Sequence, residues 1–367
     1  MGVRVLTVLA LAAGAAAAPL LAQDAGSPRA LTGAEYYSLS FGSGLGTKSL
    51  HELVVPLGFT VPVGRRLLLD LGTYYVNAKR TDEAGASGTV SGLTDVVLRG
   101  AWQIRPDIAA LTVAVNLPTG QRELSSDQLL VAGAVATDLI PFPVTSFGTG
   151  VSVTTSLAYA VPVGPWALGV AGGYRYNGSY QPLADTSANL KPGSEVRLRV
   201  GADRLIGQGR LTLGFTFSTF SRDEFGADRL GAGRRYISQA SWNIPVGNNT
   251  VALYAWDVHR TNAAFGPDSL RTPQLTVNTL AFGAVAGLRV GRNLLRPSIE
   301  LRHAWQGTTK VAGAGTLVGI GARYQWNVGT RFILLPGVRA DLGSIPGAGG
   351  NVSFTGVSAG LSVRATL

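Results

Sequence analysis

The chain has 367 residues, of which 46% are hydrophobic, only 14% are charged and 49 are glycine. Soluble domains usually carry about 25% charged residues, so this composition argues against an ordinary soluble protein. The net charge of +10 is spread along the chain without a dense basic run, which argues against a nucleic-acid-binding arm. The sequence has no cysteine, and this excludes a disulfide framework.

The N-terminal segment, residues 1–22, has the layout of a secretory signal peptide. Arg4 supplies the positive end, an apolar run follows from Val5 to Ala18, and we expect cleavage after Ala22. An uncleaved membrane anchor is the alternative, but the apolar run is short for a spanning helix. The remaining residues, 23–367, are expected to form a single domain.

This domain contains no apolar run long enough for a transmembrane helix. An exported, apolar and glycine-rich chain without such a helix indicates a β-barrel, because a closed barrel satisfies every backbone hydrogen-bonding group between its strands. We therefore predict an all-β fold, a transmembrane antiparallel up-and-down β-barrel in the outer membrane of a Gram-negative bacterium.

Short breaks that contain glycine or proline alternate with longer polar segments along the chain. The break "PVG" occurs at 62–64, 162–164 and 245–247, each time after a hydrophobic run. The longer segments, such as 79–91 and 343–351, are rich in turn and loop formers. Short periplasmic turns alternating with longer extracellular loops are typical of an outer-membrane barrel and place both termini on the periplasmic side.

The runs between these breaks predict 16 strands, with 14 as the alternative, because bacterial barrels have even strand numbers. They lie near 33–42, 49–62, 66–79, 93–104, 108–117, 147–162, 166–178, 194–205, 209–221, 234–246, 249–261, 277–290, 294–305, 313–327, 330–342 and 353–366.

Within several strands, apolar residues alternate with small or charged ones, as expected for one face toward lipid and one toward the lumen. By this parity the following charged residues point into the lumen: Arg99, Arg175, Arg197, Arg199, Arg289, Arg302, Arg323, Arg339, Asp70, Asp95, Asp203, Glu300 and Asp341. They either pair across strands in a filled or narrow lumen or form an arginine-biased wall that selects anions or orients polar substrates.

The aromatic residues predict two girdles at the membrane interfaces. One set lies near the short turns and consists of Trp102, Trp166, Trp242 and Trp326. The other set lies about one membrane strand further along and consists of Tyr74, Tyr75, Tyr174, Tyr176 and Trp256.

The segment from Ser125 to Val144 interrupts this rhythm. Ser125 can cap a helix and Pro141 can stop it, so we predict a helix near Asp127–Leu139. This helix either packs on the rim or in the mouth of the barrel, or it forms a constriction or plug. An extra hairpin is the remaining alternative.

Catalytic and metal-binding patterns are weak in this sequence. The three histidines, His51, His259 and His303, lie far apart, and neither a G-x-S-x-G elbow nor a histidine pair with metal-ligand spacing is present. We expect no enzyme activity, no metal and no cofactor, although a lipid-modifying enzyme with serine and histidine at the barrel rim stays an alternative.

Two neighbouring segments, "GLTDVVLRGAW" at 92–102 and "LTVAVNLPTG" at 111–120, resemble the phenol-degradation meta-pathway outer-membrane protein family. The matching residues are Gly92, Asp95, Arg99, Pro118, Thr119 and Gly120. The resemblance implies a transporter-like barrel that passes small, often aromatic, molecules and has no catalytic residues. It also implies that Asp95 is a structural partner of an arginine and that the Pro-Thr-Gly turn leads out of a strand. The segment 125–144 departs from the family's compact pattern.

These observations favour a monomeric outer-membrane channel or transporter for the passive passage of small molecules, aromatic or anionic. Its expected partners are outer-membrane lipid and a small-molecule solute, with no nucleic acid. A structural or adhesive barrel with a filled lumen is the first alternative, and the lipid-modifying enzyme is the second.

Overall fold

The structure is a computed structural model that describes residues 27–367 except 227, 266–271, 275, 307–310 and 348. The expected signal peptide, residues 1–22, lies outside the described residues. No helix among the described residues is both long and apolar enough to cross a membrane.

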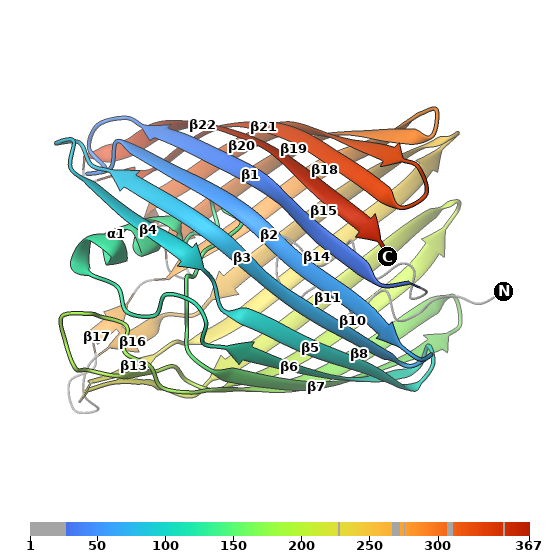
Figure 1. Ribbon diagram of the computed structural model, residues 1–367, viewed down its shortest axis with the longest axis horizontal. Helices are drawn as coiled ribbons and strands as arrows, with labels where there is room; N and C mark the ends of the chain where they lie inside the picture. The colour runs from blue at the N-terminus through green and yellow to red at the C-terminus, as the bar shows by residue number, and fades with distance from the viewer. Residues whose placement is uncertain (1–26, 227, 266–271, 275, 307–310, 348) are drawn as a thin grey trace.

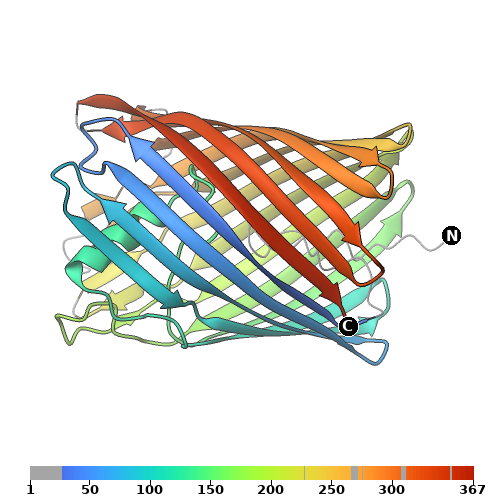
Figure 2. The same cartoon turned by 45° about the horizontal axis from the view of Figure 1, so that its top comes forward.

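Seventeen strands form one antiparallel sheet that closes on itself (Figures 1 and 2). β4 and β5 both pair with β3 and are two halves of one crossing, so the barrel has 16 crossings, as predicted. Closure is made by β1 and β22, which pair from Arg29 opposite Thr366 to Phe41 opposite Phe354. The barrel strands are β1 (Arg29–Phe41), β2 (Ser49–Val63), β3 (Leu67–Thr81), β4 (Ser87–Leu93), β5 (Val96–Arg105), β6 (Ala109–Leu117), β7 (Ser152–Val163), β8 (Trp166–Asn177), β10 (Glu195–Ile206), β11 (Gly209–Phe220), β14 (Arg234–Val246), β15 (Asn249–Arg260), β18 (Val277–Val290), β19 (Asn293–Gln306), β20 (Val311–Val328), β21 (Phe332–Gly347) and β22 (Gly350–Thr366).

Several strands reach further than the sequence predicts. The segments 79–91 and 343–351 were expected to be long loops, but β3 runs to Thr81, β4 starts at Ser87, and β21 and β22 pair as far as Gly347 opposite Gly350. These extensions carry many polar residues, because ladder hydrogen bonds outside the lipid do not require an apolar outer face. Hydrophobicity therefore marks only the part of each strand that faces lipid.

Seven short turns lie at one end of the barrel, where β1 starts and β22 ends (Figure 1). Six of them contain a glycine with a positive φ, between 57° at Gly164 and 65° at Gly329. The seventh uses Asp107, at φ 59°. Residues in the left-handed region allow hairpin turns of two or three residues whose twist matches the strands, which explains the recurring glycine in the sequence.

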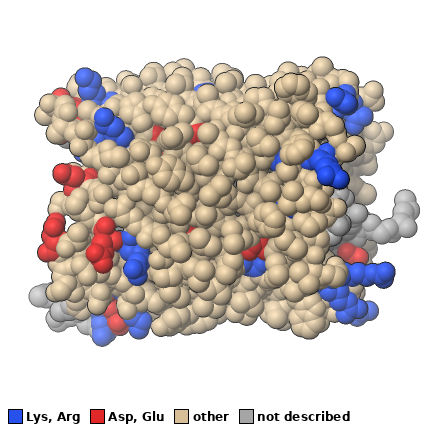
Figure 3. Space-filling view, in the orientation of Figure 1, with Lys and Arg blue, Asp and Glu red and all other residues tan. Residues whose placement is uncertain are grey.

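The outer face of the barrel is a broad apolar band with charges near the two ends (Figure 3). On β19, for example, Ile299 and Leu301 are 51% and 47% exposed, whereas Glu300 between them is 5% exposed. This contrast separates the lipid-facing side chains from those on the inner face.

The predicted aromatic girdles are only partly present. Trp102 and Trp326 near the short turns, and Tyr174 and Tyr176 toward the other end, are exposed on the outer face. Two assignments were wrong, because successive residues of a strand face opposite sides. Tyr74 packs against the apolar cluster inside the barrel, and Trp256 lies under the guanidinium of Arg302 on the inner face. Further outward aromatics are Tyr75 and Trp242.

Residues 118–151, between β6 and β7, form what we call the inner loop. It contains α1 (Ser126–Val135), which starts with a capping box between Ser125 and Gln128. The helix ends before Leu139, contrary to our prediction, and β7 starts at Ser152 rather than near 147. The reason is that the apolar residues between 139 and 147 are buried against the barrel wall in a non-helical conformation.

A second sheet of five short strands extends the barrel at the same end as α1 (Figure 1). It comes from three neighbouring loops and consists of β9 (Leu190–Lys191), β12 (Asp223–Phe225), β13 (Asp228–Gly231), β16 (Ala263–Phe265) and β17 (Thr272–Gln274). We had expected loops at all of these positions.

Candidate functional site

The inner loop covers part of the inner wall through apolar contacts. Val131 and Val135 of α1 are fully buried together with Val90 of β4, and Phe142 packs beside Tyr37 of β1. The same cluster includes Leu39, Leu50, Val54, Val76, Ala78, Leu139, Ile140, Val144, Phe147, Ala304, Leu317 and Phe354. Burial of a Val, Leu or Phe side chain contributes about 1.5–3 kcal/mol, so many such side chains hold the loop against the wall. The inner loop therefore narrows the lumen.

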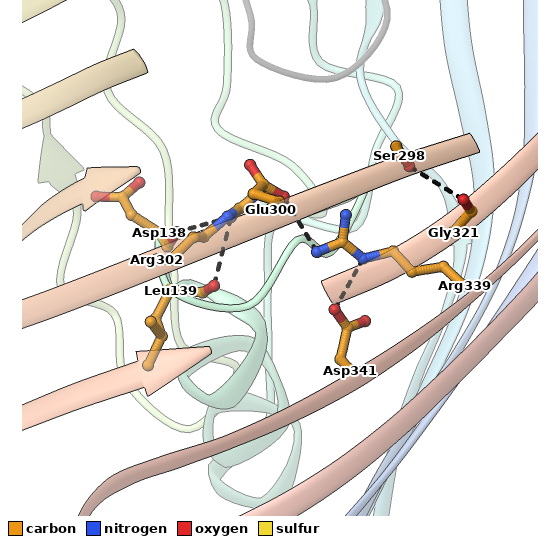
Figure 4. A network of polar contacts seen from close by, with 8 residues as sticks. All are labelled: Asp138, Leu139, Ser298, Glu300, Arg302, Gly321, Arg339 and Asp341. Carbon is orange, nitrogen blue, oxygen red and sulfur yellow. Dashed lines mark hydrogen bonds and ion pairs between the residues drawn. The ribbon is translucent and has the colours of Figure 1, made fainter. Parts of the chain in front are cut away.

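Polar contacts tie the same loop to β15 and β19, and Figure 4 shows those to Arg302 of β19. Asp138 forms an ion pair with Arg260, and the Arg302 guanidinium donates to the Asp138 carbonyl oxygen at 2.9 Å. Arg302 also stacks on Trp256, with 5.2 Å between the guanidinium carbon and the ring centroid. The loop thus spans from the apolar cluster to the charged inner face of β19.

Arg302, Glu300, Arg339 and Asp341 form one ion-pair network on β19 and β21 (Figure 4). The Glu300 carboxylate lies 3.2 Å from Arg302 and 3.0 Å from Arg339, and Arg339 lies 2.8 Å from Asp341. Two carboxylates thus meet two guanidiniums, so this part of the wall carries little net charge. These four residues match the cross-strand pairing interpretation.

Two further pairs lie on other strands. Arg99 is 2.6 Å from Asp70, which also accepts from the Thr60 hydroxyl at 2.7 Å. Asp203 is paired with Arg210 at 2.7 Å, a residue that the sequence analysis did not single out. Arg210 sits near the short turn, where the alternation is hardest to read.

An arginine-rich group lies on β8, β10 and β14. Glu195 accepts from Arg197 and from Arg235, each at 2.9 Å, and Arg175 stands opposite Glu195 in the strand register. Arg199 lies two residues further along the inner face of β10. We call Arg175, Arg197, Arg199 and Arg235 the arginine wall. The Glu195 carboxylate thus lies beside three of these arginines, and Arg199 follows further along the same face.

The arginine wall borders the part that the inner loop covers, because Arg235 stands opposite Arg260, which forms the ion pair with Asp138 of the loop. The Arg197 and Arg235 side chains keep 36% and 27% of their surface exposed. Water therefore reaches this side of the inner face.

Arg235 was missed by the sequence analysis, although it follows from strand parity. In β14, Trp242 is outward, so Arg235 lies on the inner face together with Ile237, Gln239 and Ser241. Ile237 breaks the polar pattern of this face, which hides the arginine. The cross-strand neighbours that place Arg235 beside Arg197, with Ser218 between them, appear only in the register.

A second set of arginines lies nearer to the short turns. Arg323 is 3.6 Å from Glu35 and keeps 46% of its side chain exposed. Arg296 lies opposite Arg323 and donates to Gln325 at 3.4 Å. Arg289 lies exposed at the end of β18 beside a short turn, opposite Leu294 of β19.

Among the ion pairs of the described residues none joins Asp95 to an arginine, which corrects our expectation. Its carboxylate accepts from the backbone N–H groups of Gly120 and Thr149, at 2.9 and 2.8 Å, and from the Asn116 amide at 2.7 Å. Gly120 and Thr149 lie near the two ends of the inner loop. Asp95 therefore holds the two ends of the inner loop together. It lies in the short gap between β4 and β5, where its carboxylate can reach both ends.

The three histidines are not brought together. The three histidines lie on three different strands, β2, β15 and β19. Each is next to an aromatic ring: His51 is beside Tyr36, His259 is beside Tyr236 and His303 is beside Trp305. Within the described part of the chain, no group of three or more histidine, aspartate or glutamate residues could hold a metal ion.

The closed barrel, its apolar outer band and its loop-narrowed interior together define the fold of an outer-membrane β-barrel channel. Among solved structures, OprB of Pseudomonas putida has this fold with a TM-score of 0.54 and 10% identity, over 93% of this chain and 94% of that chain. At this identity the match shows the fold alone.

Two further channels match with lower TM-scores. The CymD monoaromatic hydrocarbon channel has a TM-score of 0.46 and 11% identity, over 93% of this chain and 88% of that chain. An outer membrane channel from Pseudomonas putida F1 has a TM-score of 0.38 and 13% identity, over 92% and 95% of the two chains. No protein-family model and no curated protein match the sequence.

Proposed function

We propose that this protein is a passive channel for small solutes in the outer membrane. In this proposal residues 1–22 direct export, the barrel works as a monomer, the short turns and termini are periplasmic, and the longer loops face outward. The apolar outer band, together with water-accessible charged groups on the inner face, supports a solute path through the barrel rather than around it.

The arginine wall carries the proposal that the path favours anions. Three arginines beside the single carboxylate of Glu195, with Arg199 further along the same face, bring more positive than negative charge to an inner face that water reaches. Rings of basic side chains select anions in pores because they attract the ion where its hydration is reduced. The ion pairs of Glu300 and Asp70 add no comparable excess of positive charge, because carboxylates there match the arginines in number.

The solute class follows from the same wall together with the family resemblance of residues 92–120. A small aromatic carboxylate has a negative charge for the guanidiniums and a flat ring that can stack on them. We therefore propose aromatic acids as preferred solutes, and the phenol-degradation family as the relevant group of barrels.

Liposome swelling tests this proposal with three solutes of similar size, benzoate, benzyl alcohol and benzylammonium, each entry rate being taken relative to that in protein-free liposomes. We expect benzoate to enter fastest and benzylammonium slowest. In the double variant Arg197→Gln/Arg235→Gln the benzoate advantage should fall several-fold, whereas Arg65→Gln/Arg66→Gln, in a short turn outside the lumen, should leave it unchanged. Folded protein that lets none of the three solutes enter would support the filled-lumen alternative instead.

A further inference from the structure

A hollow of about 390 Å³ lies where β8 leaves the membrane band and meets the second sheet. Tyr174 and Tyr176 line it and are 50% and 48% exposed. They alternate with Arg175 of the arginine wall, so they point to the outside of the barrel. Tyr174 stands opposite Val196, which is 44% exposed on the same outer face. The hollow therefore opens toward lipid and not toward the lumen.

Charged side chains of the second sheet form the other side of this hollow. Glu224 is opposite Lys191 of β9 and opposite Arg229 of β13, so these three side chains form a row across one face of the sheet. Arg222, two residues before Glu224, also lines the hollow. Three cations and one carboxylate thus lie above two tyrosines.

The backbone around the hollow is held in place. The Asp223 carboxylate accepts from the Gly193 N–H, and the Ser194 N–H donates to the Ser221 hydroxyl at 2.8 Å. Asp223 is half-buried, and this burial raises the pKa of its carboxyl. These contacts join the loop before β10 to the loop after β11, so Lys191 and Arg222 are positioned by both.

We propose that this hollow binds the phosphorylated sugar headgroup of a glycolipid in the outer leaflet. The cations match phosphate, and exposed tyrosines are the residues that sit at the headgroup level of a membrane. A carboxylate in the row also suits a sugar, because it accepts hydrogen bonds from hydroxyl groups. The proposal rests on the outward direction of the longer loops, which is part of the proposed function.

Native mass spectrometry of the detergent-solubilised full chain tests this site with bisphosphorylated lipid A as the probe. Lys191→Ala and Arg229→Ala should each weaken binding on the order of fivefold, since one basic residue near an anionic headgroup contributes roughly that factor. Glu224→Gln should strengthen binding, because the amide keeps an oxygen that accepts a sugar hydroxyl but removes the negative charge of the only carboxylate that lines the hollow among the described residues. Arg65→Ala/Arg66→Ala at the opposite rim is the matched control.

Dephosphorylated lipid A and phosphatidylglycerol separate the contributions of phosphate and sugar. We expect both to bind more weakly than bisphosphorylated lipid A. Equal weakening by the Lys191 and Arg65 variants would overturn the site, since it would show only general attraction between a basic protein and an anionic lipid. Weaker binding by Glu224→Gln, or equal binding of phosphatidylglycerol, would also overturn it. Solute flux after reconstitution of the same proteins into liposomes reports on the channel separately, so the two proposals can fail independently.

Discussion

At the residue scale, Glu52 differs from the other acidic groups of the inner face. It is fully buried between β2 and the inner loop, near the backbone of Val144, and no ion pair among the described residues includes it. Glu300 is also buried but contacts two arginines. A buried carboxylate without an ion-pair partner lowers the free energy of unfolding. Removal of a paired one leaves its partner arginines as uncompensated charges, which also lowers it.

Opposite effects are therefore expected from the same substitution at these two positions. Glu52→Gln should raise the free energy of unfolding by about 1–3 kcal/mol, because it removes a charge that burial penalises. Glu300→Gln should lower it by about 3–5 kcal/mol, because Arg302 and Arg339 lose their shared partner. Urea unfolding in detergent, followed by tryptophan fluorescence, measures both changes. A destabilised Glu52→Gln variant would contradict this expectation, because it would show that the buried Glu52 carboxylate has a stabilising partner.

At the element scale, the inner loop depends on its two ends. Asp95 holds Gly120 and Thr149, so Asp95→Ala removes the acceptor of two backbone N–H groups. Hydrogen bonds to a charged group contribute about 1.5–3 kcal/mol each, so local opening should increase at least tenfold. Limited proteolysis of the folded barrel should then cut within 118–151 at least ten times faster. Asp127→Ala, on the exposed first turn of α1, serves as the control, and equal cleavage of both variants would refute this role of Asp95.

The turn after β3 provides a pH-dependent contact at the same scale. Glu83 accepts from the backbone N–H groups of Gly46, Gly44 and Leu45, at 2.9, 2.8 and 3.0 Å, and these bonds lower the pKa of its carboxyl. A lowered folded-state pKa means that the contact stabilises the turn above the ordinary glutamate pKa and is lost as the pH falls through the folded value.

Hydrogen exchange at residues 44–46 measures this contact. Protection relative to the intrinsic exchange rate should be highest above the ordinary glutamate pKa and should decrease in acid. Glu83→Gln should flatten this dependence, and Asp82→Asn should leave it in place. A wild-type profile that is flat across the acidic range would contradict the assignment.

At the scale of the whole molecule, composition and turn chemistry were enough to predict a barrel of 16 strands. Glycines such as Gly64 and Gly164 mark the turns, and alternation such as that around Glu300 marks the lipid-facing sides. The path of the inner loop could not be predicted, because its apolar residues between 139 and 147 are compatible with a helix, a strand or a buried loop. The grouping of Arg235 with Arg197 needed the strand register, which a single sequence does not specify.

The most direct measurement is the reversal potential of the wild-type protein in a planar bilayer with unequal potassium chloride concentrations on the two sides. We predict stable conductance steps and a reversal potential displaced toward the chloride equilibrium potential, because the arginine wall attracts anions. A reversal potential displaced toward the potassium equilibrium potential would contradict the anion path. An absence of current from protein whose gel mobility shows a folded barrel would contradict the channel itself.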